Sequence, residues 1–171
     1  TITAGTAAAL STALVTNGDA TVNAYKLTVN NDNTTTLATD LTGLDGKTSV
    51  AVDAHLVTDI SGSSVEVLAA YVANTAGTIT GLGNETVTIT DAAATVANVS
   101  AINTATSGLV DVAEVDVTAA TFSLTDLGLL TGITGLTTID AATSTNVSAL
   151  TLKFADLLTV DSGTSSAIAV K

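Results

Sequence analysis

The residue best suited to acid–base chemistry is His55, the only histidine in this 171-residue chain. It lies in the stretch VDAHLVTD, between Asp53 and Asp59. An imidazole beside a carboxylate could activate a serine hydroxyl for hydrolysis. However, the sequence has no GxSxG motif, the turn that presents the serine in many hydrolases. We therefore expect a surface or turn histidine, and a hydrolase using His55 is the minor alternative.

Acidic residues at short spacing suggest a second chemistry, the binding of a divalent cation. Asp111 precedes a predicted strand, and Glu114 and Asp116 share one face of it because alternate residues of a strand point the same way. Calcium takes about six to eight oxygen ligands, carboxylates among them. These three residues are the candidate calcium ligands, and the alternative is that they are solvated charges. We expect no catalytic or cofactor-binding residue.

Charge and composition exclude several classes of partner. Sixteen acidic residues oppose four lysines, arginine is absent, and the net charge is −12. Nucleic-acid binding needs clustered basic residues that neutralise phosphates, and the same acidity disfavours an anionic membrane surface. Cysteine is absent, which excludes disulfides and thiolate metal sites. No apolar run approaches the roughly 18 to 20 residues of a membrane span, so we expect no membrane insertion.

Glycines recur along the chain at the spacing of a structural repeat. Each chosen glycine follows a segment of helical periodicity, where a glycine often ends the helix. The glycines are Gly18, Gly46, Gly77, Gly108, Gly135 and Gly163. Each is separated from the next by roughly 30 residues, a period typical of solenoid repeats. We expect a single repeat domain over 1–171, with one unit ending near each glycine. Because the chain starts at Thr1 rather than Met, we also expect a fragment of a larger chain.

The segments before the first four glycines carry apolar residues at helical spacing. These stripes are Ala7, Leu10 and Leu14; Leu37, Leu41 and Leu44; Val65, Leu68, Ala69, Val72 and Ala76; and Val96, Val99 and Ile102. Each stripe is expected to face a core. Ser63 and Glu66 have the spacing of a capping box for the third helix, and Asp91 is the expected N-cap of the fourth.

Segments rich in β-branched residues follow the glycines and are expected to be strands. Strands separated by a helix should be parallel, since a parallel pair needs a long crossover connection. The predicted fold is therefore an α/β repeat, a solenoid of about six helix-glycine-strand units. One parallel sheet forms one side of the solenoid, and the helices form the opposite side. The alternative is a mainly β sandwich or a β-solenoid.

The repeats resemble those of very large bacterial surface proteins. The resemblance rests on TITDAAATVANVSAINTATSG, SLTDLGLLTGITGLTTIDAAT and LTLKFADLLTVDSG, and it is best over residues 78–165. Similar Ala/Thr/Asp repeats occur in S-layer-like proteins, cyanobacterial cell-surface motility proteins and RTX-type adhesins. The resemblance implies an extracellular structural or adhesive role, often with bound calcium. The calcium-binding GGxGxDxUx nonapeptide of RTX proteins is missing, and LTGLDGK at 41–47 matches only a fragment of it.

Together these features predict a non-catalytic structural or adhesive segment of a secreted or cell-surface bacterial protein. The expected partners are neighbouring repeats or identical subunits, with glycans or a cell surface as further candidates. One alternative is the protomer of an extracellular filament or viral appendage. Another is a carbohydrate- or surface-binding module.

Overall fold

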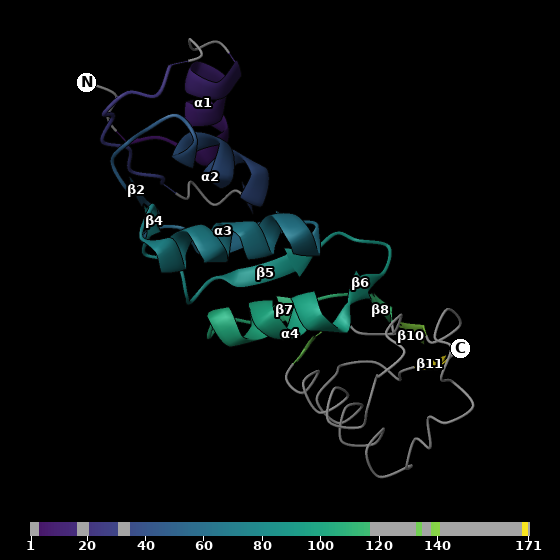
Figure 1. The fold of residues 1–171 in the computed structure, drawn as a ribbon. Coiled ribbons are helices and arrows are strands. Elements are labelled where there is room, and N and C mark those ends of the chain that lie inside the picture. Colours follow the sequence, from purple (N-terminus) through teal and green to yellow (C-terminus); the bar gives the residue numbers. More distant parts are fainter. Residues whose placement is uncertain are drawn as a thin grey trace.

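A computed structural model describes residues 4–16, 21–30, 35–116, 133–134, 138–140 and 169–170. Figure 1 shows that the helices follow one another along the length of this part, with strands beside them. The helical segments are α1 (Ala7–Ser11), the π-helical turn η1 (Thr12–Thr16), α2 (Ala38–Asp45), α3 (Ser64–Ala76) and α4 (Val96–Ala105). Consecutive α-helices pack against each other, α1 on α2, α2 on α3 and α3 on α4.

Every strand pair among the described residues is parallel, as the predicted α/β class requires. One sheet has the order β1-β3-β5-β7-β9, a second β11-β10-β8-β6, and a third contains β2 and β4. The first sheet comprises β1 (Thr36–Leu37), β3 (Asp59–Gly62), β5 (Thr86–Ile89), β7 (Val110–Asp111) and β9 (Ile133–Thr134). The others comprise β2 (Val52–Asp53), β4 (Ile79–Thr80), β6 (Ala94–Thr95), β8 (Glu114–Asp116), β10 (Thr138–Asp140) and β11 (Ala169–Val170).

The strands that follow the glycines do not form the one continuous sheet that we expected. Gly46 is followed by β2 and Gly77 by β4, and these two strands do pair in parallel. Gly108, however, is followed by β7, which pairs with β5 in the five-stranded sheet. The physical reason is that the chain turns after β2, where the Val57 amide donates to the Ala54 carbonyl, and then forms β3. The expectation of one strand per unit missed this second strand.

The backbone returns to the five-stranded sheet at nearly constant intervals. Successive partners in the register are Thr36, Ile60, Val87, Val110 and Ile133. Each follows the last by roughly 25 residues, a period in the range of solenoid repeats. All five side chains are buried, so they form one row that faces the helices. Fully burying a valine or isoleucine contributes about 1.5–3 kcal/mol, and the row therefore stabilises each pass of the chain against the next.

Three of the four predicted helical stripes face the core, although Leu37 lies in β1 and is exposed. The stripe of α3 is wrong. The structure buries Ser64, Val67, Ala70 and Tyr71 instead, and leaves Val65 and Val72 67% and 60% exposed. The helix has apolar residues on nearly every side and a single charged residue, Glu66. Periodicity therefore does not fix its rotation, which packing against α2 and α4 decides.

The predicted helix ends are confirmed at α3. The Ser63 and Glu66 side chains form the reciprocal capping box, and Gly77 ends the helix with a left-handed φ of 80°. Gly46 follows α2 directly but keeps a right-handed conformation. The expected N-cap of α4 is wrong, because Thr95 occupies that position and its hydroxyl accepts the Asn98 amide.

Gly108 does not end a helix as predicted, since α4 finishes at Ala105. Its role is a close approach between two passes of the chain. A Cβ added at Gly108 would lie 2.1 Å from the Glu85 carbonyl oxygen, so only glycine fits. Gly18, Gly135 and Gly163 themselves lie outside the described residues, so the unit ends predicted there stay predictions.

Candidate functional site

The three predicted metal ligands lie at the same end of the described region but on two different sheets. Asp111 is exposed in β7, where its register partners are Thr88 and Thr134. Glu114 and Asp116 flank the buried Val115 in β8 and therefore share one face of that strand, as the alternation predicted. The strand β8 pairs with β6 and β10 rather than with β7.

No group of three or more histidine, cysteine, aspartate or glutamate side chains is assembled as a metal site among the residues that the structure describes. In the register of the four-stranded sheet, Asp116 is opposite Asp140 on one side and Thr95 on the other. The ladder thus brings a second acidic residue to the position beside Asp116. Calcium binding at Asp111, Glu114 and Asp116 stays a prediction, to be tested in solution.

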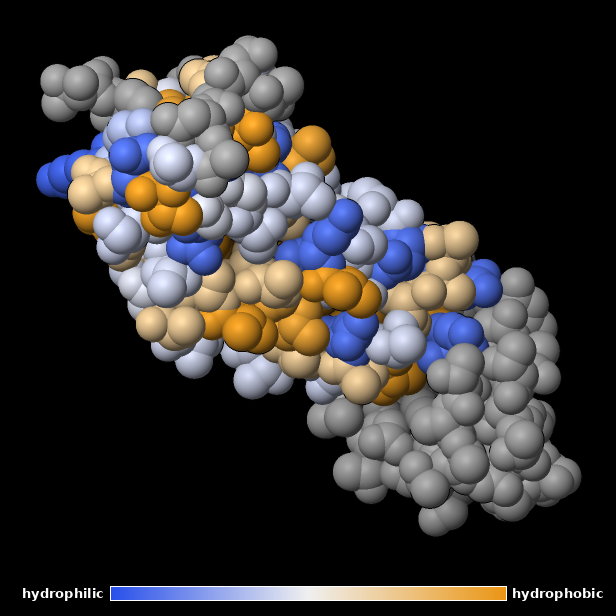
Figure 2. Space-filling view, turned by 45° about the horizontal axis from the view of Figure 1, so that its top comes forward, coloured by the Kyte–Doolittle hydropathy of each residue, from blue (hydrophilic) through white to orange (hydrophobic). Residues whose placement is uncertain are grey.

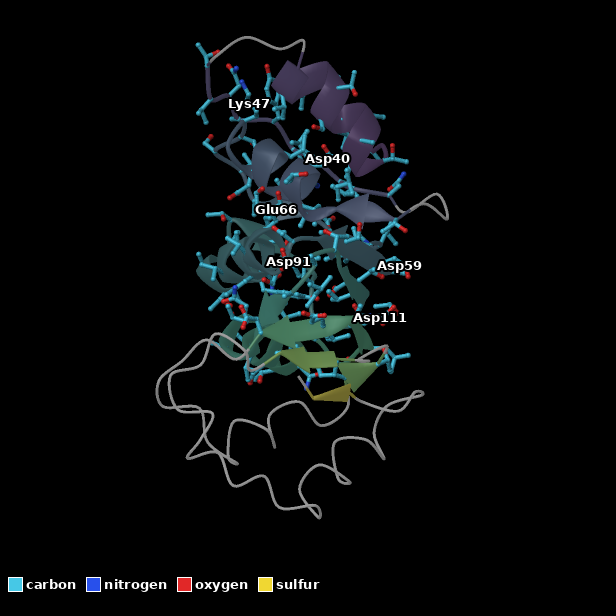
Figure 3. All side chains as sticks on the ribbon, turned by 90° about the vertical axis from the view of Figure 1, so that its right-hand side faces the viewer. Asp40, Lys47, Asp59, Glu66, Asp91 and Asp111 are labelled. Carbon is cyan, nitrogen blue, oxygen red and sulfur yellow. The ribbon has the colours of Figure 1, made fainter. Side chains whose placement is uncertain are left out.

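Acidic and hydroxyl side chains also mark the outer face of the five-stranded sheet. Figure 3 shows Asp59 and Asp111 on the same side of the molecule, on the strand side rather than the helix side. Between them in the sheet lies β5, whose Thr86 and Thr88 are exposed while Val87 is buried. The Thr58 hydroxyl donates to the Asp59 carboxylate at 2.7 Å. The face presents hydroxyls and carboxylates, groups that bind water and cations.

The His55 side chain lies within hydrogen-bond distance of one of its two neighbouring aspartates. Its Nδ1 lies 2.5 Å from the Asp53 carboxylate, and the two side chains are 57% and 35% exposed. This hydrogen bond to His55 lowers the pKa of Asp53. The pair lies at a tight junction, because a Cβ at Gly81, whose φ is 93°, would be 2.6 Å from the His55 backbone. His55 therefore sits in a turn at the surface, as the sequence predicted.

A buried polar network around Glu85 was not predicted from the sequence. The Glu85 side chain is fully buried, accepts the Tyr71 hydroxyl at 2.8 Å, and accepts the Gly83 amide at 2.7 Å. The Thr106 hydroxyl donates to the Glu85 carbonyl at 2.8 Å and accepts the Gly108 amide at 2.9 Å. Burial, and next the charge of Glu85, raise the pKa of Tyr71 well above its ordinary value. The network thereby joins α3, the segment before β5 and the segment after α4.

The N-terminus of α3 is a second junction between distant segments. Asp91, which precedes α4 in the chain, accepts the Ser64 backbone amide at 2.6 Å. The Asn98 side chain donates to the Ser64 hydroxyl at 3.3 Å. A carboxylate at this end also interacts favourably with the helix dipole. In Figure 3, Asp91 and Glu66 lie near each other in the middle of the described region.

No family model matches the chain, and no curated protein or solved structure matches it in the searches made. In the part of the chain that the structure describes, none of the helices has the length and apolarity needed to cross a membrane. The polar side chains that form the Glu85 network and the junction at Ser64 connect one pass of the chain to the next.

Proposed function

We propose that this chain is a non-catalytic structural segment of a bacterial extracellular or cell-surface protein, built as an α/β solenoid of about six units. In such a protein each unit buries its apolar face against its neighbours, and the whole segment acts as a spacer or stalk. The register of the five-stranded sheet, to which the chain returns at nearly constant intervals, supports the solenoid.

The proposal rests mainly on the hydrogen bonds of the buried polar groups, which join segments that are distant in the sequence. Tyr71 and Glu85 are 14 residues apart, Glu85 and Thr106 are 21 apart, and Ser64 and Asp91 are 27 apart. Each bond therefore joins segments about half a repeat to one repeat apart. A catalytic centre instead leaves reactive groups facing a substrate. Here the groups are satisfied within the scaffold.

Charge placement supports an exposed, hydrated role for the strand side. Asp59 and Asp111 lie there with the exposed hydroxyls of β5. A net charge of −12 keeps such a surface soluble and resists clumping. The likeness of the Ala/Thr/Asp repeats to those of large bacterial surface proteins points the same way.

An antibody raised against the segment tests the location. We expect it to label intact cells that make the natural protein, and protease added outside should remove the label. A cytoplasmic protein in the same cells serves as the control for leakage. Labelling that requires permeabilised cells would contradict the proposal.

A further inference from the structure

An apolar groove lies on the surface between α3 and α4. Its volume is about 420 Å³, and it is lined by Leu68, Tyr71, Val72, Thr75 and Ala76 of α3 and by Ala101 and Ala105 of α4. Tyr71 presents its ring to the groove, while its hydroxyl is bonded to the buried Glu85. The groove therefore has a mainly apolar lining, and the hydrogen bond to Glu85 holds the Tyr71 side chain in place.

Exposed apolar side chains continue the groove along α3. Val72 lines it, and Val65 lies earlier on the same stripe; they are 60% and 67% exposed. In Figure 2, apolar residues form a continuous area across the middle of the visible face. A scattered exposed valine is ordinary, but a contiguous apolar patch beside a groove is typical of an interaction surface.

The helices that form the groove carry almost no charge. Between them, α3 and α4 contain a single charged residue, Glu66, and its carboxylate accepts the Ser63 amide at the start of α3. The carboxylates of Asp59 and Asp111 lie on the strand side of the molecule. A partner that recognises charge would therefore bind elsewhere, whereas this face suits a partner that is itself apolar and uncharged.

A second copy of the chain carries a face of that chemistry. Two copies, each with a net charge of −12, repel each other over most approaches. None of the residues that line the groove is charged, so a contact there places no carboxylate inside the groove. We propose that this groove binds the same groove of a second copy in a twofold, isologous contact, with Val65 and Val72 of each copy seated in the groove of the other. The inference rests on the proposed structural role, to which it adds an identical subunit as partner.

Sedimentation velocity over a range of micromolar concentrations tests the contact on the full chain. We expect a dimer whose population rises with concentration. Added NaCl should strengthen it, because salt screens the repulsion between like-charged copies and leaves an apolar contact intact. Val72→Asp should raise the dissociation constant at least about tenfold, since two buried carboxylates would face each other near the twofold axis.

Two further variants keep the test decisive. Thr88→Asp adds the same charge on the exposed side of β5 and should leave the dimer unchanged beyond a small electrostatic effect. Circular dichroism shows whether each variant is folded. Ala101→Glu places a charge on the α4 side of the groove at an exposed position, where it should not disturb folding. It should therefore weaken the dimer and keeps the test valid if Val72→Asp proves to be unfolded. A chain that stays monomeric throughout, or a dimer that survives both groove variants, overturns the proposal. Either result leaves the surface-labelling test of the proposed function unaffected.

Discussion

Replacing Tyr71 by phenylalanine removes one hydroxyl from a fully buried polar network. The Glu85 carboxylate at its centre accepts the Tyr71 hydroxyl at 2.8 Å and the Gly83 amide at 2.7 Å. A hydrogen bond to a charged group contributes about 1.5–3 kcal/mol, and an unsatisfied buried carboxylate oxygen cannot recover it from water. We therefore expect Tyr71→Phe to lower the free energy of unfolding by about 1.5–3 kcal/mol. For a chain of this size, the midpoint temperature of thermal unfolding should fall by about 3–12 °C.

The same variant should change the response to alkaline pH. Burial raises the pKa of Tyr71 above its ordinary value of 10.0, so the folded protein holds this proton more tightly than the unfolded chain does. The resulting stabilisation is complete below about pH 10 and is lost as the pH rises further. Wild type should lose stability in that range, and Tyr71→Phe should lose less.

Urea unfolding followed by circular dichroism, at neutral pH and again above about pH 10, measures both effects. Tyr25→Phe is the matched control, because it makes the same chemical change at a partly buried tyrosine outside the Glu85 network. The contradicting result is a Tyr71→Phe variant whose free energy of unfolding lies within about 0.5 kcal/mol of wild type, the range of an ordinary surface substitution, and which loses as much stability at alkaline pH as wild type does. That result would mean that the Glu85 network does not hold these segments together.

Three further predictions concern the junctions and the acidic strands. Gly108→Ala should destabilise the protein strongly or prevent folding, because its Cβ would lie 2.1 Å from the Glu85 carbonyl oxygen, and thermal unfolding will show whether it does. Asp91→Ala should cost about 0.5–2 kcal/mol in urea unfolding by removing the acceptor of the Ser64 amide, whereas an unchanged midpoint would argue against this cap. Millimolar calcium should stabilise the chain, by about 2.7 kcal/mol when the free ion is about 100 times the dissociation constant, and substituting the acidic residues of β7 and β8 should abolish the effect. If sodium at matched ionic strength raised the stability equally, the acidic residues would be solvated charges that do not bind calcium specifically.

Local signals in the sequence predicted part of the fold well. Ser63 and Glu66 mark the start of α3 because both partners of a capping box lie within one turn of helix. The inward face of α4 was predicted from a looser stripe, because its only large apolar residues are Val96, Val99 and Ile102, and all three are buried. Parallel pairing followed from the length of the helical connections.

Features that depend on contacts with a neighbouring repeat could not be predicted from local signals in the sequence. Glu85 stands in GNETVTIT like any solvated residue before a strand, and its partner Thr106 is 21 residues further on. Asp91 has the sequence position of a cap for α4, yet its partner Ser64 is 27 residues earlier. The rotation of α3 was missed because a nearly uncharged helix offers more than one apolar face. In each case the deciding contact is long-range.

Deleting one whole repeat tests the central claim most directly. Removing residues 60–86 joins Asp59 to Val87, which occupies the register position of Ile60 on the neighbouring strand. A solenoid should close over this deletion, and circular dichroism with urea unfolding should show a folded chain with a cooperative transition. The shorter deletion of residues 60–73 places Asn74 at that position and cuts α3, so it should abolish cooperative unfolding. Loss of folding in both variants, or equal tolerance of both, would contradict a scaffold built from stacked repeats.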